Sequence, residues 1–339
     1  LLSFFERRAA AALVRGFHFF RIQHIVFLLS CPQIAAYLFM SLFSSLQRYF
    51  VPAAGFFLYP QSQYRPPEAR VYAFTNGTLI DEEFCQEMLR VGNLFVSISV
   101  EGFEEANDGR RGNGHFQKAL DAMELMHSHR IPFGVSICYT SQNYKVVTSD
   151  DFLDLLISKG CVFAWYFHYM PVGINASTDL LLTPEQRTYM KDRVREIRGV
   201  TGGKELYCID FQNDGEFAGG CVAGGRIYCH INAAGDVEPC VFIHYSSANI
   251  REKSFLECLQ QPLFKLYRKG QPFNGNHLRP CPMLENPELL PKMVAQSGAH
   301  STDLEAPESA EHLCEKCKSY AECWKPTAET LWSNSHPTP

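Results

Sequence analysis

Short apolar runs that alternate with helix-like segments are the feature that most limits what this chain can fold into. From Val71 onward, four such runs have the length of strands, and each is followed by a segment with the spacing or the capping residues of a helix. The runs are residues 71–75, 94–100, 133–139 and 161–169. Strands that alternate with helices form a parallel sheet with right-handed crossovers. The sequence therefore predicts an α/β fold, either an open sheet or a complete or partial (β/α) barrel, with ligands at the carboxyl ends of the strands.

Local signals indicate where the helices begin and which face they bury. Asp81 precedes the first helix, at a position where a carboxylate accepts hydrogen bonds from free backbone amides. The tetrad Thr183-Pro184-Glu185-Gln186 combines a capping box with proline at the first helical position. A spacing of three and four predicts one apolar helix face, made of Phe116, Ala119, Leu120, Met123 and Met126. We interpret these methionines as core residues.

Charge and cysteine content exclude some classes of protein. The net charge of the 339 residues is -5, with mixed signs and no long basic run, so we expect no nucleic-acid partner. A peptide or small-molecule substrate fits better. The 13 cysteines are an odd number and too sparse for a small disulfide scaffold, and no usual signal peptide opens the chain. We therefore expect a cytoplasmic protein, in which clustered thiols indicate metal binding or catalysis.

Residues 1–66 differ in composition from the rest of the chain. Glu6 is their only acidic residue, and they contain no lysine. The stretch from Ile25 to Leu46 has no charged residue and is long enough to cross a bilayer, so a membrane helix is one interpretation. The chain starts with leucine and its composition changes abruptly near Pro67, so we favour the other interpretation, a truncated or frame-shifted start. We expect no membrane partner.

Three short motifs lie at the ends of the predicted strands. They are TNGT at residues 75–78, SISVEG at 97–102 and RRGNGHF at 110–116. Each alone fits ordinary turn chemistry, because Asn-Gly is a common turn. In this order they resemble the radical S-adenosylmethionine (SAM) superfamily, which has TNG after one strand, S-x-D/E-G after the next and R-G-x-G-x-F at the start of the following helix. The resemblance covers roughly residues 67–325 and implies a partial (β/α) TIM-like barrel with a small cysteine-rich C-terminal extension.

The resemblance also implies a binding site for SAM. Ser99 and Arg111 would hold the carboxylate of SAM, with Arg110 as a substitute for Arg111, because a guanidinium donates two parallel hydrogen bonds to a carboxylate. Glu101 either contacts the ligand or faces water at the end of its strand. Residues 171–173, Pro-Val-Gly, match a further family position near SAM. The expected SAM-binding set is Thr75, Asn76, Gly77, Ser99, Glu101 and Arg111.

The composition changes again beyond Gly219. An apolar run at 227–231, a turn at 232–236 and the segment 237–240 predict a hairpin with Cys240 at its exit. The pattern G-D-x-x-P-C at 235–240 resembles the SPASM-type extension, which binds auxiliary 4Fe–4S clusters in peptide-modifying radical SAM enzymes. Farther on, a CxxC pair places two sulfurs on one tight turn, and four thiolates fit either a cluster or zinc.

One auxiliary cluster is the expected number. In the full SPASM pattern the CxxC is followed by a third cysteine and, four positions later, by a fourth. Thr327 stands at the place of the fourth, and a later cysteine is also absent. The expected ligands are Cys221, Cys240, Cys281 and one or both of Cys314 and Cys317, with Cys323 in reserve. Six other cysteines are interpreted as core thiols: Cys85, Cys138, Cys161, Cys208, Cys229 and Cys258. His230 and His244 flank the hairpin, and we expect structural roles for them rather than metal ligation.

The motif that carries radical chemistry is missing from this sequence. Family members hold the radical-generating cluster with CxxxCxxC, and they also have a GGEP motif; neither occurs here, and Cys31 is the only cysteine before Val71. One electron from that cluster cleaves SAM to a 5′-deoxyadenosyl radical. The family's reaction modifies a peptide or small molecule and needs an electron donor. We expect that the chain as given does not carry out this reaction.

Four segments follow from this reading. They are an atypical N-terminal segment at 1–66, a radical SAM partial barrel at 67–218, a SPASM-like iron–sulfur domain at 219–326 and a tail at 327–339. The alternatives are a non-catalytic, metal-stabilised module that binds a peptide or partner, and a structural zinc protein. Iron with acid-labile sulfide distinguishes a cluster from zinc.

Overall fold

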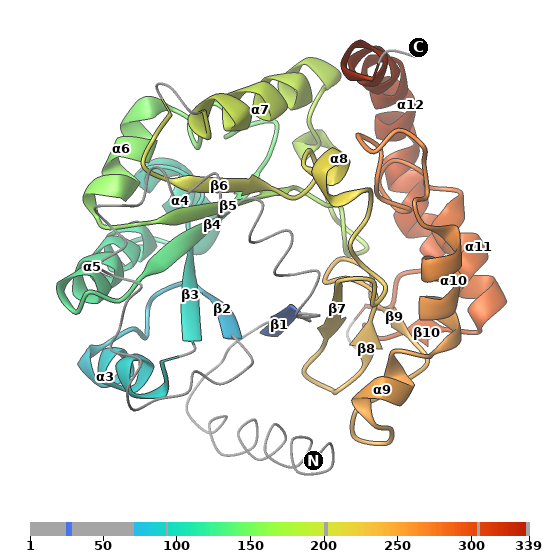
Figure 1. Ribbon diagram of the computed structural model, residues 1–339, viewed down its shortest axis with the longest axis horizontal. Helices are drawn as coiled ribbons and strands as arrows, with labels where there is room; N and C mark the ends of the chain where they lie inside the picture. The colour runs from blue at the N-terminus through green and yellow to red at the C-terminus, as the bar shows by residue number, and fades with distance from the viewer. Residues whose placement is uncertain (1–24, 29–70, 93, 200–202, 304–305, 337–339) are drawn as a thin grey trace.

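One eight-stranded sheet organises the computed structural model, which describes residues 25–28, 71–92, 94–199, 203–303 and 306–336 (Figure 1). The strand order is β6-β5-β4-β3-β2-β1-β7-β8. Strands β2 to β6 are parallel, whereas β1 pairs antiparallel with both β2 and β7. The eight strands are β1 (Ile25–Leu28), β2 (Val71–Thr75), β3 (Leu94–Ser99), β4 (Phe133–Tyr139), β5 (Phe163–His168), β6 (Tyr207–Asp210), β7 (Tyr228–Ile231) and β8 (Val237–Glu238).

The helices that connect the parallel strands cover the outer face of this curved sheet (Figure 1). They are α3 (Glu82–Val91), α4 (Glu104–Arg111), α5 (His115–Ser128), α6 (Asp150–Ser158) and α7 (Pro184–Ile197), with a short 3-10 helix η2 (Thr178–Leu180) before α7. The predicted alternation of strands and helices is confirmed. The sheet is a partial (β/α) barrel, and no closed barrel is seen among the described residues.

The predicted helix starts are present in the structure. The Asp81 carboxylate accepts a hydrogen bond from the Phe84 amide at 2.9 Å, and Thr183 and Gln186 form the reciprocal capping box. One helix, α4, was not predicted. It is short and polar, and the Asp108 carboxylate near its end accepts hydrogen bonds from the amides of Gly114 and Phe116, which begin α5.

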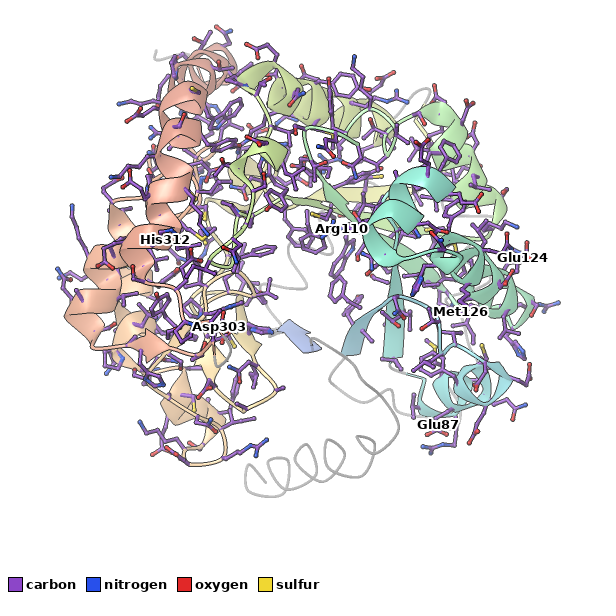
Figure 2. All side chains as sticks on the ribbon, turned by 180° about the vertical axis from the view of Figure 1, so that it is seen from behind. Glu87, Arg110, Glu124, Met126, Asp303 and His312 are labelled. Carbon is purple, nitrogen blue, oxygen red and sulfur yellow. The ribbon has the colours of Figure 1, made fainter. Side chains whose placement is uncertain are left out.

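The predicted apolar face of α5 packs against the sheet. All five of its residues are buried, and Met123 and Met126 are 0% exposed. Figure 2 shows Met126 on the inner side of α5 and Glu124 on its outer side. The prediction that these methionines are core residues is confirmed.

The cysteine-rich region has a core of its own. Its elements are α8 (Gly215–Ala218), the predicted hairpin of β7 and β8, β9 (Tyr245–Ser246), α9 (Phe255–Cys258), α10 (Pro262–Gly270), α11 (Leu289–Ser297), β10 (His300–Ser301) and α12 (Ala310–Ser335). The CxxC pair at Cys314 and Cys317 lies on α12, so the prediction of a tight turn was wrong. Residues three apart on an α-helix share one face, and both sulfurs still lie on the same side.

No helix among the described residues is long and apolar enough to cross a membrane. The uncharged stretch at 25–46, in which we considered a membrane helix, lies outside the described residues except for β1.

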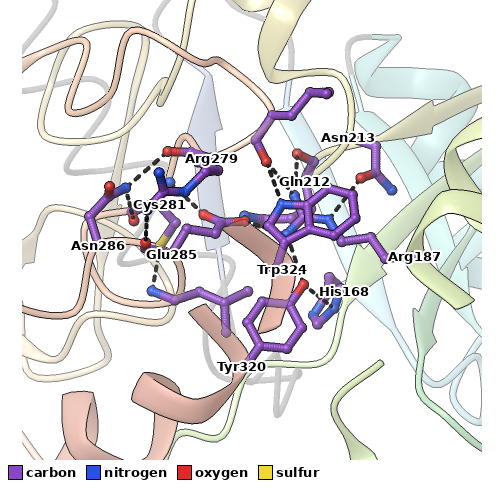
Figure 3. Close-up of polar contacts among 12 residues, drawn as sticks. His168, Arg187, Gln212, Asn213, Arg279, Cys281, Glu285, Asn286, Tyr320 and Trp324 are labelled. Atoms are coloured by element: carbon purple, nitrogen blue, oxygen red, sulfur yellow. Dashed lines mark hydrogen bonds and ion pairs between the residues drawn. The ribbon is translucent and has the colours of Figure 1, made fainter. Parts of the chain in front are cut away.

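A buried arginine joins the sheet region to the cysteine-rich region (Figure 3). Arg187 on α7 and Glu285, in the loop before α11, pair at 2.7 Å, and both side chains are 0% exposed. Arg187 also donates hydrogen bonds to the Tyr320 hydroxyl of α12 at 2.8 Å and to the Leu278 carbonyl at 2.9 Å. Its guanidinium lies over the Trp324 ring, 4.2 Å from the ring centroid. All four of these partners come from the cysteine-rich region.

Replacing Arg187 with methionine should destabilise the whole chain. The change leaves the Glu285 carboxylate buried without its cation, and breaking a buried pair in this way costs about 3–5 kcal/mol. Chemical unfolding of the full chain measures the loss. The control is Arg90→Met, which removes an exposed arginine from a surface pair with Glu87 and should cost no more than about 1 kcal/mol. Equal losses in the two variants would contradict the role given to Arg187.

Candidate functional site

The predicted SAM-binding residues meet at one edge of the sheet because their strands are parallel. Thr75 ends β2, Ser99 ends β3, and the register pairs Ser99 with Ser136 of β4. The two serine hydroxyls are 3.0 Å apart. This edge is the carboxyl edge of the strands, where ligands of such folds bind.

A carboxylate and two arginines form the charged part of this edge. Glu101 is 2% exposed and pairs with Arg110 at 2.9 Å and with Arg111 at a closer distance. Burial is the largest influence on Glu101 and raises its pKa, while the two arginines oppose that rise. Of the two readings of Glu101, the structure thus supports the buried acid rather than a carboxylate facing water. One negative and two positive charges leave a net positive charge at the strand ends.

The two arginines differ in how far they reach the surface. The Arg110 side chain is 50% exposed, and Figure 2 shows it at the ends of the central strands. The Arg111 side chain is 24% exposed, and its Nε atom has no hydrogen-bond partner among the described residues. Both therefore retain guanidinium atoms that can bind a carboxylate in addition to Glu101.

Cys138 belongs to the same edge, although the sequence suggested a core thiol. It follows Ser136 by two residues on β4, so both side chains lie on the same face of the sheet. Burial, the largest influence, raises the pKa of the Cys138 thiol, and the nearby Arg110 guanidinium opposes that rise. The period of two along β4 is the signal that could have placed Cys138 beside Ser136 at this site.

The TNG turn uses its side chains locally. The Thr75 hydroxyl accepts a hydrogen bond from the Gly77 amide at 3.1 Å, and the Asn76 side chain accepts one from the Thr78 amide at 3.1 Å. Gly77 has a positive φ of 79°, and a Cβ there would lie 3.2 Å from the Ile98 side chain. These contacts fit the turn chemistry expected of Asn-Gly, and they leave the backbone of the turn at the same edge as Ser99.

The Pro-Val-Gly segment after β5 contacts helix α12. The Gly173 amide donates to the Glu308 carboxylate at 3.1 Å, and Lys316 donates to the Gly173 carbonyl at 2.7 Å. Glu308 and Lys316 pair with each other at 2.6 Å. This segment therefore attaches the cysteine-rich region to the sheet.

Five cysteines from four segments of the cysteine-rich region share one apolar cluster around Tyr267 of α10. They are Cys221 before β7, Cys240 after β8, Cys281 in the loop before α11, and Cys314 and Cys317 on α12. These are the five cysteines that the sequence put forward as cluster ligands. Burial is the largest influence that raises the pKa of the Tyr267 hydroxyl. The nearby thiols of Cys221, Cys281, Cys240 and Cys314 raise this pKa further.

Backbone amides point at three of these sulfurs. The Cys281 sulfur accepts hydrogen bonds from the amides of Met283 and Leu284, both at 3.4 Å. Burial raises the pKa of the Cys221 and Cys240 thiols. The backbone amide of Ala223 opposes this rise at Cys221, and the backbone amide of Phe242 opposes it at Cys240. Amides aimed at sulfur stabilise the thiolate, which is the form that binds iron.

The donor set fits an iron–sulfur cluster. Among the described residues, no three His, Cys, Asp or Glu side chains converge to hold a single metal ion. A four-iron cluster puts each thiolate on a different iron, so its ligands need not converge on one point. The Tyr267 hydroxyl, buried among these thiols, has no hydrogen-bond partner within the described part of the chain. A buried orphan hydroxyl surrounded by thiols is consistent with a site built for a polar group.

The remaining predicted ligands and core thiols lie elsewhere. Cys323 is exposed on α12, while Cys229 and Cys258 lie in a separate small core. His230 contacts the Glu238 carboxylate at 2.6 Å, and His244 contacts the Val241 carbonyl at 3.1 Å. Both histidines therefore have structural contacts, as expected.

A model of the radical SAM superfamily matches residues 9–156, and a model of an iron–sulfur cluster-binding domain, SPASM, matches residues 221–283. The first match begins within the segment 1–66. The chain thus carries a radical SAM domain and a SPASM iron–sulfur cluster-binding domain. These two domains imply SAM and 4Fe–4S clusters as cofactors.

Curated relatives are similar over part of their length. An AdoMet-dependent heme synthase of Methanosarcina barkeri is 25% identical over 229 residues, which cover 61% of this chain and 65% of the relative. The mycofactocin maturase MftC of Mycolicibacterium smegmatis is 31% identical over 175 residues, which cover 50% of this chain and 44% of the relative. This chain thus spans less than two thirds of the length of either relative.

Solved structures are similar at a lower level. Streptococcus suis SuiB bound to the precursor peptide SuiA has a TM-score of 0.49 and 15% identity, covering 62% of this chain and 53% of that one. The structure of anSMEcpe with bound AdoMet and Cp18Cys peptide has a TM-score of 0.46 and 18% identity, covering 78% of this chain and 76% of that one.

A buried histidine is connected to Arg187 through the Tyr320 hydroxyl (Figure 3). His168 at the end of β5 lies 3.1 Å from the Tyr320 hydroxyl through Nε2 and 2.7 Å from the Tyr169 carbonyl through Nδ1. Tyr320 accepts a hydrogen bond from Arg187, so its own proton is available for Nε2, and the carbonyl requires a proton on Nδ1. Burial, and then the charge of Arg187, lower the pKa of His168 from 6.5 to about 3.

The stability of the chain should fall in acid because of His168. Below pH 6.5 the unfolded chain binds a proton at His168 that the folded chain does not bind until about pH 3. Stability due to this group is therefore complete above pH 6.5 and is lost toward pH 3, by at most about 1.4 kcal/mol per pH unit. Urea unfolding at a series of pH values should show a smaller acid loss for His168→Asn than for the parent chain. His127→Asn, at an exposed position of α5, should keep the parental dependence, and an unchanged dependence in His168→Asn would refute the assignment.

Proposed function

We propose that this chain binds one auxiliary 4Fe–4S cluster through Cys221, Cys240, Cys281 and one thiol of the Cys314 and Cys317 pair. The observation that carries the proposal is the gathering of these cysteines around the buried Tyr267 hydroxyl, which finds no hydrogen-bond partner in the described part of the chain. Cys314 is the better fourth ligand, because its thiol, like the other three, is close enough to Tyr267 to raise the pKa of its hydroxyl. Cys317 instead donates to the Leu313 carbonyl of its own helix at 3.6 Å.

The strand ends form the proposed site for the carboxylate of SAM. Ser99 offers a hydroxyl, and Arg110 and Arg111 offer guanidinium groups. Glu101 neutralises one of the two positive charges, so the remaining charge matches one carboxylate. The backbone of residues 75–77 lies at the same edge of the sheet and completes the proposed pocket.

The family reaction is the basis for the wider proposal. In that reaction, CxxxCxxC would hold a cluster that would supply the electron for reductive cleavage of SAM, and a peptide or small molecule would be modified. The relatives named above include a heme synthase and a maturase, and both named structures contain a peptide. A chain with the present sequence has no CxxxCxxC. We propose that it binds SAM and a cluster in the cytoplasm without cleaving SAM, and that the family reaction on such a substrate requires CxxxCxxC.

Within this proposal, the residues of the chain have distinct tasks. The backbone amides of Ala223, Phe242 and Met283 stabilise the thiolates that bind iron. Arg110 and Arg111 bind and orient the carboxylate of SAM, and the apolar cluster around Tyr267 excludes water from the cysteines.

Serine substitutions should identify the cluster ligands. After anaerobic reconstitution with iron and sulfide, the full chain should contain about four irons and four sulfides. Cys221→Ser, Cys240→Ser and Cys281→Ser should each lose most of the iron and the brown absorbance, because one thiolate is missing. Cys314→Ser should lose more than Cys317→Ser.

The control for this series is Cys85→Ser, on α3 far from the cysteine cluster, which should load as the parent does. Folding of each variant is checked by circular dichroism. Full loading of all three ligand variants, or colourless stoichiometric zinc in the parent, would contradict the proposed cluster.

Charge changes at the strand ends should alter SAM affinity in opposite directions. Arg111→Met or Arg110→Met removes the net positive charge, and loss of a charge-assisted hydrogen bond of about 1.5–3 kcal/mol should weaken binding roughly 10-fold or more. Glu101→Gln raises the net charge and should leave binding equal or tighter. Calorimetric titration with SAM measures each affinity, and Arg90→Met is the exposed control. Equal weakening in Glu101→Gln and Arg111→Met would refute the carboxylate site.

A further inference from the structure

Glu285 joins a proposed cluster ligand to the sheet region, which gives it a role beyond packing. One of its carboxylate oxygens, Oε2, accepts a hydrogen bond from the backbone amide of Cys281 at 2.7 Å. The other oxygen, Oε1, accepts hydrogen bonds from Arg187 at 2.7 Å and from the Gln212 side chain. The side chain is 0% exposed. A single buried carboxylate therefore contacts the loop that carries Cys281 through one oxygen. Through its other oxygen it contacts α7 and the loop between β6 and α8.

The loop that carries Cys281 has few remaining degrees of freedom. The Asn286 side chain donates to the Arg279 carbonyl at 2.9 Å and to the Cys281 carbonyl at 3.0 Å. Arg279 donates to the Glu285 carbonyl at 3.3 Å. With two amides on the Cys281 sulfur, these contacts hold the sulfur in one direction. The contact between Glu285 and the Cys281 amide connects this turn to the sheet region, in addition to the hydrogen bond from Arg187 to the Leu278 carbonyl just before it.

The charge of Glu285 also reaches the thiols. After burial, Glu285 is the largest influence that raises the pKa of Cys281, and it also raises the pKa of Cys221 and Cys317. Arg187 lies on the far side of the carboxylate and carries the opposite charge. In a buried site such charges are weakly screened, and nearby charge and hydrogen bonds are among the factors that set the reduction potential of a cluster.

We propose that Glu285 is a positioning residue for the ligand Cys281, and that the Glu285–Arg187 pair tunes the reduction potential of the auxiliary cluster. This inference rests on the proposed cluster site. Negative charge near a cluster opposes its reduction, and positive charge favours it. Changing the two members of the pair therefore has opposite electrostatic consequences, whereas their structural consequences are alike.

The experiment compares the midpoint potential of the cluster in the reconstituted full chain with that in its variants. Redox titrations monitored by absorbance and electron paramagnetic resonance measure these potentials. Glu285→Gln removes a negative charge and should shift the potential to more positive values. Arg187→Met removes a positive charge and should shift it to more negative values. Arg187→Lys retains the charge and should restore most of the parental potential. Glu252→Gln, which removes the same charge from an exposed position of the same region, should leave the potential unchanged.

The outcomes separate this inference from the proposed function. A parent chain that takes up no iron and sulfide overturns the cluster and this inference with it. A parent chain that loads, combined with Glu285→Gln at the parental potential, overturns this inference alone. Shifts of the same sign in Glu285→Gln and Arg187→Met also overturn it, because that result indicates general loosening of the site. If Arg187→Met does not fold, the comparison of Glu285→Gln with Glu252→Gln decides the question.

Discussion

The guanidinium of Arg187 is buried where the parallel sheet meets the cysteine-rich region, and the arrangement of both depends on it. A buried cation is costly to desolvate unless charge and hydrogen bonds compensate. Here the compensation comes from Glu285, Asn213, Tyr320 and two backbone carbonyls, together with the ring of Trp324. Most of these partners belong to the cysteine-rich region, so that region must dock in one orientation for the charge to be satisfied. Burial and, after it, the charge of Arg187 lower the pKa of His168, and the pairing of Arg187 with Glu285 also contributes to holding the loop of Cys281.

The two candidate sites use charge in contrasting ways. At the strand ends, two arginines outnumber one buried carboxylate, and the surplus positive charge faces the edge where ligands bind in such folds. In the cysteine cluster, apolar packing and burial raise the pKa of each thiol, and backbone amides oppose that rise at three of them. At the proposed cluster site, iron binding would therefore depend on local amide geometry as well as on the presence of cysteine. That geometry is set partly by Glu285, which links the cysteine cluster to the sheet.

Patterns along the chain were sufficient to predict the helices and strands and most of the residues that meet at the two candidate sites. The period of strands and helices predicted a parallel α/β sheet, open or closed, and the family resemblance implied a partial barrel. Motif order implied that residues 75–77, Ser99, Glu101 and Arg111 share one edge of the sheet. These signals are local, because side-chain period, capping and turn residues act over a few positions. The short polar helix α4 was missed, since it has no apolar face. The CxxC pair was assigned to a turn, because its spacing fits a turn and an α-helix equally well.

By itself, the sequence determined the alternation of strands and helices, the family, and which cysteines are candidates for a cluster. It did so because each of these is encoded by spacing between near neighbours. Only the tertiary structure decided that Cys138 joins the strand-end site, that Glu101 is buried between two arginines, and that Arg187 bridges to Glu285, 98 positions away in the sequence. Such contacts join segments that are distant in the chain, and burial then changes the energetic consequence of each charge. Neither the distance in space nor the local dielectric can be read from the spacing of residues.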